Sequence, residues 1–345
     1  MPDKKSGGKS RVAVYGAAGH TGRFVVSELL RRGMTPVAAG RDTSRLLATG
    51  LEDSGVELRG ASIDDPASLD QAFVDVAMVI NCAGPFLDTA ETVAAAALRA
   101  GAHYLDVTAE QASATATLEH FAEPARRAGL LVMPAMGFFG GLADLLVTAA
   151  AGDWESVDDV AIGIALDSWH PTQGTRLTGA RNTAQRLMVT GGALAPLALP
   201  AATRAWDFPP PFARQEMVEM PLSEVVLVAR HLRTRELHTY LSAAALNDIR
   251  DPATPPPQPV DAHGRSAQRF LVEAIVQKGG LERRARVGGR DIYAFSAPLV
   301  CEAAERILDH RTTARGAFAP GAAFDAASFL GAIAPDAFTT EARGA

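Results

Sequence analysis

Apolar and polar positions follow a regular alternation over the first 137 residues. Short apolar runs predict strands at Arg11–Tyr15, Pro36–Ala39, Leu58–Ile63, Val76–Cys82, His103–Thr108 and Leu130–Ala135. Runs with helical periodicity lie between them, at Thr21–Arg32, Thr43–Leu51, Pro66–Phe73, Thr89–Ala100 and Glu110–Ala128. Strands that alternate with helices pair in parallel, and the helices cover both faces of the sheet. This half of the chain therefore predicts an α/β fold with a doubly wound parallel sheet.

The pattern changes after Gly137, where strand-like segments follow one another with fewer helical crossovers. Alternating or β-rich runs occur at Val157–Leu166, Met217–Ala229, Glu236–Ala243, Gln268–Gln277 and Asp291–Ser296. Helical patterns occur at Leu142–Ala151 and at Pro298–Leu308, where a proline suits the first turn. We expect a second α+β domain with a mostly antiparallel or mixed sheet.

A length of 345 residues suits two domains better than one. We place a dinucleotide-binding domain at residues 11–138 and a domain for substrate binding or oligomerisation at residues 139–297. The segment 298–335 is expected to pack back onto the first domain. Residues 1–10 are polar and rich in glycine and serine, so they predict a disordered tail.

Charge and composition narrow the class of protein. A net charge of −6 argues against nucleic acid as a partner, because nucleic-acid binding needs a basic face. Two cysteines make neither a metal cluster nor a disulfide framework. The weakly polar stretch 188–205 contains Pro196 and Pro200 and is not expected to span a membrane. We expect a cytoplasmic homo-oligomer that binds a small-molecule substrate and neither a metal, nucleic acid nor a membrane.

Three evenly spaced glycines stand where the first strand meets the first helix, in the stretch VAVYGAAGHTGRF. Gly16 permits the sharp turn, Gly19 lets a diphosphate approach the backbone, and Gly22 lets the helix pack close to the strand. The helix N-terminus offers free N–H groups to phosphates. This Rossmann-type loop predicts dinucleotide contacts from Gly16, Ala18, Gly19, His20, Thr21 and Gly22. A plain glycine-rich turn is the alternative.

The residues at the end of the second strand indicate which dinucleotide cofactor is bound. Binders of NAD usually carry an acidic residue there, whereas this strand ends in AAGRDTSR. Arg41, with Ser44 and Arg45 one turn further on, offers donors for a 2′-phosphate, so we predict NADP. An ordinary surface arginine at position 41 is the alternative. Asp64, after the third strand, is a candidate for the adenine amino group or, like Asp65, for the cap of the next helix.

Two further motifs carry a family resemblance. The fourth strand ends INCAGPF (residues 80–86), and the fifth reads GAHYLDVTAEQ (residues 101–111). Together with GAAGHTGR, they resemble the saccharopine dehydrogenase-like reductases, including their short bacterial and enoyl-reductase-like relatives. Ala109 stands where the family usually has glycine, and the following carboxylate, Glu110, is kept. The resemblance is specific over about the first 140 residues, and it implies an NADP-dependent oxidoreductase.

These motifs place candidate side chains at the carboxyl edge of the parallel sheet, where ligands of doubly wound folds bind. Cofactor contacts are predicted from the turn Cys82, Ala83, Gly84, Pro85 and Phe86. Tyr104, Asp106 and Glu110 are candidate catalytic residues, since a hydroxyl and two carboxyls can move protons or hold a substrate amine. The alternatives are that Phe86 packs in the core and that the two carboxylates only join the strand to its helix.

The short-chain dehydrogenase pair Tyr-x-x-x-Lys is absent after all four tyrosines, which disfavours carbonyl reduction. We therefore expect hydride transfer between a nicotinamide and a C=N or activated C=C bond, with C=O as the less favoured acceptor. A non-catalytic NADP-binding redox sensor is the alternative function. Arg176, Arg181 and Arg186 are candidates for substrate carboxylates, although their spacing does not place all three on one helical face.

Overall fold

The computed structural model describes residues 10–343, so the predicted tail lies outside the described residues except for Ser10. Its first sheet is parallel and has the strand order β15-β6-β5-β4-β1-β2-β3. The strands are β1 (Arg11–Tyr15), β2 (Thr35–Gly40), β3 (Glu57–Gly60), β4 (Met78–Asn81), β5 (His103–Asp106), β6 (Leu131–Met133) and β15 (Gly316–Ala317). The order reverses beside β1, which is the arrangement of a doubly wound sheet.

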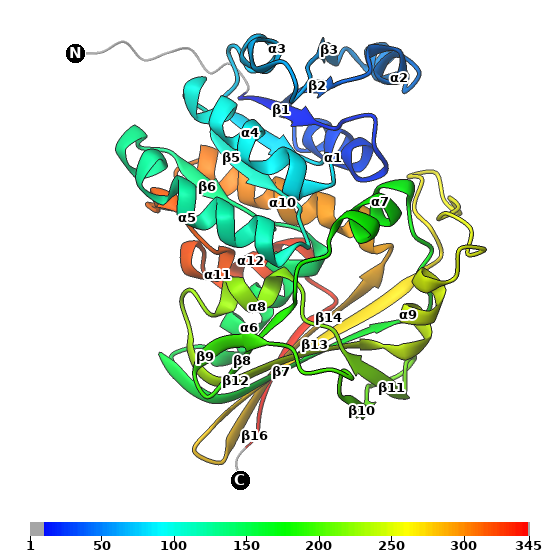
Figure 1. Ribbon diagram of the computed structural model, residues 1–345, viewed down its shortest axis with the longest axis vertical. Coiled ribbons are helices and arrows are strands. Elements are labelled where there is room, and N and C mark those ends of the chain that lie inside the picture. Colours follow the sequence, from blue (N-terminus) through cyan, green and yellow to red (C-terminus); the bar gives the residue numbers. More distant parts are fainter. Residues whose placement is uncertain (1–9, 344–345) are drawn as a thin grey trace.

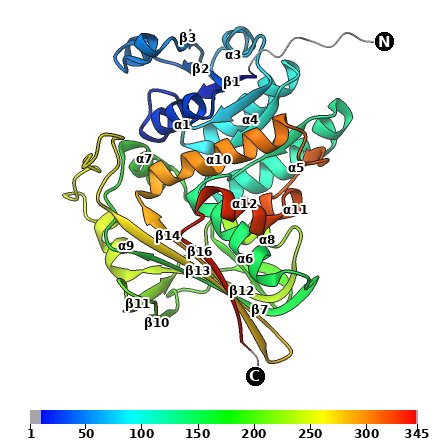
Figure 2. The ribbon, with the colours of Figure 1, turned by 180° about the vertical axis from the view of Figure 1, so that it is seen from behind.

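Helices cover both faces of this sheet, as Figures 1 and 2 show from opposite sides. The connecting helices are α1 (His20–Arg31), α2 (Thr43–Leu47), η1 (Leu51–Ser54), α3 (Pro66–Ala72), α4 (Phe86–Arg99) and α5 (Gln111–Ala128). Val25 and Leu29 of α1 share a core with Val12 and Val14 of β1. Residues of α3, α4 and α5 pack with the opposite side chains of the same strand. Because both faces of this sheet are buried, its strands consist of continuous apolar runs.

The second sheet has nine strands and is mixed. Its main path runs β10-β11-β12-β7-β13-β14-β16, and the β8–β9 hairpin joins through β12. Only the pair β12–β7 is parallel in the described part of the sheet. The strands are β7 (Ser156–Leu166), β8 (Leu187–Thr190), β9 (Ala193–Pro196), β10 (Thr203–Asp207), β11 (Arg214–Glu219), β12 (Arg233–Ser242), β13 (Arg269–Lys278), β14 (Leu281–Arg290) and β16 (Phe338–Arg343).

The remaining helices lie around and between the two sheets. They are η2 (Phe138–Leu142), α6 (Ala143–Ala151), α7 (Gln173–Arg181), α8 (Ser223–Val228), α9 (Ala243–Arg250), α10 (Ile292–Leu308), α11 (Pro320–Ala323) and α12 (Ala326–Ile333). After β14 the chain returns to α1, where Arg32 forms ion pairs with Glu302 and Glu305 of α10. It then adds β15 to the first sheet and β16 to the second.

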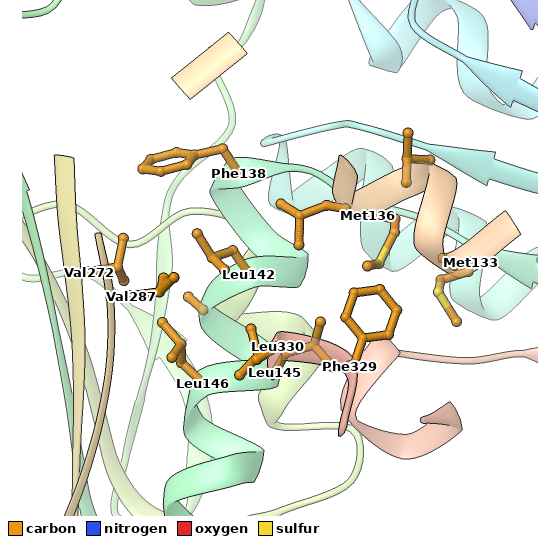
Figure 3. Close-up of a cluster of buried hydrophobic side chains, with 14 of the residues drawn as sticks. Met133, Met136, Phe138, Leu142, Leu145, Leu146, Val272, Val287, Phe329 and Leu330 are labelled. Atoms are coloured by element: carbon orange, nitrogen blue, oxygen red, sulfur yellow. The ribbon is translucent and has the colours of Figure 1, made fainter. Parts of the chain in front are cut away.

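One apolar cluster runs from the first sheet into the second (Figure 3). Met133 and Met136 enter it from the end of β6, and Val272 and Val287 enter it from the second sheet. Leu142 and the following turns of α6 lie between them, and Phe329 and Leu330 of α12 close it from below in the view of Figure 3. Because the two parts share a core, the carboxyl edge of the parallel sheet is held against the second sheet.

The predicted fold class is confirmed, but two predicted strands are wrong. In Met217–Ala229 only Met217–Glu219 belong to β11, and Ser223–Val228 form α8, whose residues are all buried. Its run of consecutive apolar residues, Val225–Val228, has no periodic signal to separate it from a buried strand. Asp291–Ser296 forms the cap and first turns of α10, with Asp291 accepting from the N–H groups of Tyr293 and Ala294. Pro298 therefore lies inside this helix and does not begin it.

Between Ser10 and Arg343, no helix combines the length and the apolar character that crossing a bilayer requires.

Candidate active site at the carboxyl edge

The glycine loop has the close contacts that its three glycines predict. Gly16 has a φ of +83°, and a Cβ added there would lie 2.8 Å from the backbone nitrogen of Ala83. A Cβ on Gly22 would collide with the carbonyl oxygen of Gly16. A Cβ on Gly19 would meet only the Gly16 carbonyl oxygen, at 3.1 Å, so its other side is open. These contacts leave the loop able to receive a diphosphate at Gly19 and the N-terminus of α1.

The residues around the glycines differ in exposure. Ala18, His20 and Thr21 are partly exposed, whereas Gly22 is buried. The His20 ring packs edge-on against Phe24 and Tyr293, with ring centroids 5.3 and 5.4 Å apart. Its Nε2 is buried and has no hydrogen-bond partner in the described part of the chain, and burial lowers the pKa of this imidazole. His20 thus joins the glycine loop to the start of α10, which comes from far along the chain.

At the end of β2, the side chain of Asp42 caps the helix that follows. Its carboxylate caps α2 by accepting from the N–H of Arg45 at 3.1 Å and from the Ser44 hydroxyl at 2.6 Å. Arg41 and Arg45 are exposed, and neither forms an ion pair among the residues described. Two arginines without carboxylate partners at this position fit a 2′-phosphate, although Ser44 already donates its hydroxyl to Asp42.

At the end of β3, the two aspartates have different surroundings. Asp65 caps α3 by accepting from the N–H groups of Ala67 and Ser68. Asp64 is exposed and lies 3.4 Å from the Ser62 hydroxyl. The helix cap that the sequence allows for either residue therefore belongs to Asp65, and Asp64 is left available to a ligand.

Asn81, Tyr104 and Asp106 form one buried hydrogen-bond network at the ends of β4 and β5. Asn81 donates to the Tyr104 hydroxyl at 3.3 Å and accepts from the N–H of Ala83 at 2.9 Å. The Tyr104 hydroxyl donates to Asp106 Oδ2 at 2.9 Å. Asp106 Oδ1 accepts from the N–H groups of Thr108 and Ala135, at 3.0 and 2.8 Å. Tyr104 and Asp106 have no exposed surface. Burial raises the pKa of Asp106 to about 6.

The turn after β4 passes directly in front of the glycine loop. Cys82, Ala83 and Pro85 are partly exposed, Gly84 is exposed, and Phe86 is buried as the first residue of α4. Burial raises the pKa of the Cys82 thiol, which keeps it protonated. The turn is thus close enough to Gly16 to border the same ligand, with its backbone and small side chains outermost.

Glu110 lies at the start of α5 and reaches across to the turn. Its Oε1 accepts from the N–H of Phe86 at 2.7 Å, at the N-terminus of α4. Its Oε2 is buried and has no hydrogen-bond partner within residues 10–343, and the residue is 1 % exposed. Burial raises the pKa of this carboxyl, opposed by the N–H groups of Phe86 and Leu87. One oxygen is therefore structural and the other is left free for chemistry.

Sequence patterns gave no signal for several groups that the fold brings to this edge. A Cβ on Gly84 would lie 2.8 Å from the Thr178 hydroxyl of α7, and Arg181 of that helix pairs with Asp88 of α4 at 2.9 Å. Glu224, the second residue of α8, is fully buried next to Ser223, whose hydroxyl donates to the carbonyl of Thr108. Arg181 is a candidate from the sequence, whereas Thr178, Ser223 and Glu224 come from distant segments without a local signal, so only tertiary structure reveals them.

Residues 12–133 match the family model described as the saccharopine dehydrogenase NADP binding domain. A "Probable mitochondrial saccharopine dehydrogenase-like oxidoreductase" of Arabidopsis thaliana is 30% identical over 161 residues, which cover 42% of this chain and 35% of that protein. A human saccharopine dehydrogenase-like oxidoreductase is 29% identical over 152 residues, 39% of this chain and 35% of that one. The alignments thus cover about a third of the length of these relatives.

The whole fold has a solved counterpart. Apo saccharopine dehydrogenase (L-Glu forming) from Saccharomyces cerevisiae superposes with a TM-score of 0.68, covering 97% of this chain and 100% of that one at 12% identity. At this identity the likeness establishes the architecture and nothing about the substrate. Residues 12–133 are thus similar in sequence to the saccharopine dehydrogenase NADP binding domain, and the whole chain shares the architecture of the solved yeast protein.

Proposed function

We propose that this protein is an NADPH-dependent reductase of a C=N or activated C=C bond in a small metabolite. When bound, NADPH supplies the hydride, and the protein supplies orientation and a proton. The site lies at the carboxyl edge of the parallel sheet, between the glycine loop, the turn after β4 and the start of α5. Carbonyl reduction is disfavoured, because the tyrosine–lysine pair of short-chain dehydrogenases is absent from the sequence.

The observation that carries this proposal is the unpartnered Oε2 of Glu110. A buried carboxyl oxygen without a hydrogen bond is unfavourable unless a ligand or a proton completes it. Burial raises the pKa of this carboxyl, and its protonated form can donate to a developing amine or carbanion. In this role the Glu110 proton goes to the substrate atom adjacent to the one that accepts the hydride.

The remaining residues have supporting roles in the proposal. Gly16, Gly19 and Gly22 admit the diphosphate, and Arg41 with Arg45 holds the 2′-phosphate. The prediction that Tyr104 and Asp106 act on the substrate directly stays a prediction. Since their side chains are fully buried and paired, we assign them the positioning of the β4 and β5 ends.

The test is oxidation of NADPH by the purified protein, followed as loss of NADPH absorbance with an imine, an enal and an enoyl ester as acceptors. We expect turnover with at least one of them. Gly19→Val should abolish NADPH binding, since its side chain would occupy the diphosphate position. Gly331→Val is the matched control, because a Cβ there meets no atom within 4 Å.

Each other outcome has a clear meaning. Tight NADPH binding without turnover of any acceptor would favour the non-catalytic redox sensor. Unchanged NADPH affinity in Gly19→Val would remove the glycine loop from the cofactor site. The predicted homo-oligomeric state and cytoplasmic location stay predictions, which sedimentation and cell fractionation would test.

A further inference from the structure

The two sheets cannot separate easily to admit a ligand at the carboxyl edge. One apolar cluster runs from the strands of the first sheet through α6 into β13 and β14 of the second (Figure 3). Opening a hinge between the two parts would expose this shared core to water, which is strongly unfavourable. Access to the edge must therefore come from a smaller element that lies outside the core.

The helix α7 is such an element, because it contributes nothing to that core. None of its residues is buried, and Leu177, at its middle, is 53 % exposed. No helix or strand within residues 10–343 packs extensively along it, and the connection that follows, residues 182–185, is mostly exposed. Helices in proteins gain most of their stability from packing, so α7 can move as a unit at little cost.

Several hydrogen bonds hold the N-terminal half of α7 to the chain around the second sheet. The Tyr293 hydroxyl accepts from the N–H of Thr172 at 3.3 Å and lies 2.9 Å from the Thr175 hydroxyl. Arg176 Nη2 donates to the carbonyl oxygen of Thr254, in the segment after α9, at 2.8 Å. These bonds fix this end of α7, which can serve as a hinge.

The C-terminal half of α7 reaches across to the first sheet, over the turn after β4. A Cβ on Gly84 would lie 2.8 Å from the Thr178 hydroxyl, so Thr178 covers one side of the turn that is predicted to border the cofactor. Arg181, at the end of the helix, forms an ion pair with Asp88 of α4 at 2.9 Å. The two side chains are 63 % and 36 % exposed, and an exposed ion pair adds little stability, so this contact breaks and re-forms readily.

We propose that α7 is a lid over the carboxyl edge, hinged near Tyr293 and latched by the ion pair between Arg181 and Asp88. A dinucleotide that reaches the turn after β4 has to pass the side of Gly84 that Thr178 covers, so it enters and leaves when the latch is broken. The inference rests on the proposed cofactor site, but it is measured as rates of cofactor binding and not as turnover. Arg181, a candidate for a substrate carboxylate, acts here on cofactor exchange instead.

The first test measures the rates at which NADPH binds and dissociates, by stopped-flow fluorescence, with excess NADP⁺ as the competing ligand for dissociation. Arg181→Ala removes the latch, so we expect both rates to rise about 1.5- to 5-fold, the range that an exposed ion pair supplies. Arg181→Asp, which places two carboxylates together, should raise both rates further, and Arg181→Asp combined with Asp88→Arg should restore them. Arg99→Ala, which breaks an exposed ion pair with Asp70, is the matched control and should leave both rates unchanged.

The second test closes the lid covalently. In the double variant Arg181→Cys/Asp88→Cys, a short bismaleimide joins the two thiols across the former ion pair. Protein that is cross-linked before NADPH is added should not bind it, and protein that is cross-linked afterwards should retain NADPH through gel filtration. Each single-cysteine variant, treated in the same way, controls for reaction at Cys82 and should exchange the cofactor freely.

Rates in Arg181→Ala and Arg181→Asp that equal those of the unmodified protein would overturn the inference, as would free exchange of NADPH in the cross-linked protein. The result is distinct from that of the proposed function. Latch-dependent exchange of NADPH without turnover of any acceptor would reject the reductase and keep the lid. Turnover with exchange rates that do not depend on Arg181 would reject the lid and keep the reductase. A protein that binds no dinucleotide would contradict both.

Discussion

Two polar groups of residues lie within one edge of the parallel sheet, and they differ in how completely they are paired. In the first, Asn81, Tyr104 and Asp106 have hydrogen-bond partners for their side-chain atoms and no exposed surface. In the second, one carboxyl oxygen of Glu110 and one of Glu224 are buried without a hydrogen bond of good geometry among the residues described.

We propose that this difference separates residues that hold the site from residues that act in it. A closed network rigidifies the structure, because each member would leave a neighbour unsatisfied if it were lost. An open set costs stability in the absence of a ligand and gains partners when a ligand binds. Substitutions in the first group should therefore change stability, and substitutions in the second should change turnover or affinity. The predictions below test that division.

The largest expected effect is on stability, from Asp106→Ala. The substitution leaves the Tyr104 hydroxyl and the N–H groups of Thr108 and Ala135 without an acceptor. Each unsatisfied donor costs about 1–3 kcal/mol, so the free energy of unfolding should fall by about 3 kcal/mol or more. Urea denaturation measures this change. Asp70→Ala, which removes an exposed ion pair with Arg99, should cost less than about 1 kcal/mol. A similar small loss in Asp106→Ala would contradict the closed network.

Glu110→Gln should show the opposite behaviour, with activity lost and stability kept. Glutamine retains an acceptor for the N–H of Phe86 but cannot donate an acidic proton. We expect turnover of a reducible acceptor to fall roughly 10²-fold, with NADPH affinity and the melting temperature nearly unchanged. Glu91→Gln, on an exposed face of α4, is the control. Unchanged turnover would remove Glu110 from the chemistry, and loss of folded protein would make it a helix cap alone.

The fold and the candidate site differ in how much of each the sequence predicts. The glycine loop, the parallel sheet and the edge residues of β4 and β5 follow from local periodicity, because each strand–turn–helix unit is contiguous. The buried helix α8 and the start of α10 were predicted as β-rich, since continuous or alternating apolar residues look alike in either state. Glu224, Thr178 and Thr239 had no local signal. Arg176, Arg181 and Arg186 were candidates from the sequence; the structure pairs Arg181 with Asp88, whereas Arg176 and Arg186 donate to backbone carbonyls.

A substitution of Arg41, at the predicted cofactor site, tests the same difference between paired and unpaired residues. Arg41 has no ion pair among the residues described, whereas Arg99 is paired with Asp70 at 2.6 Å. NADPH should bind more tightly than NADH, and Arg41→Ala should lose most of that preference, about 1–3 kcal/mol. Arg99→Ala should leave both affinities unchanged. Fluorescence titration of the unmodified protein and the two variants with each cofactor gives the six dissociation constants. Equal affinities in the unmodified protein would show that Arg41 is an ordinary surface residue.

The smallest expected effect concerns a paired carboxylate outside the site, and it depends on pH. Asp144 is fully buried, with Oδ2 accepting from the N–H of Gly321 and Oδ1 2.6 Å from His231 Nε2. Burial lowers the pKa of His231, but the charge and hydrogen bond of Asp144 outweigh it, so the pKa is raised overall. A raised histidine pKa gives stability that is complete below the unfolded pKa of about 6.5 and is lost as pH rises through the folded pKa.

His231→Gln should therefore lower the free energy of unfolding by about 1 kcal/mol at pH near 6 and by less at pH near 9. Urea denaturation of both proteins at the two pH values measures the difference. His120→Gln is the control, because His120 is exposed and 3.9 Å from Glu91. A loss that is equal at both pH values would mean that the pair holds α6 to the segment after α8 through hydrogen bonding alone. A loss that grows with pH would contradict the raised pKa of His231.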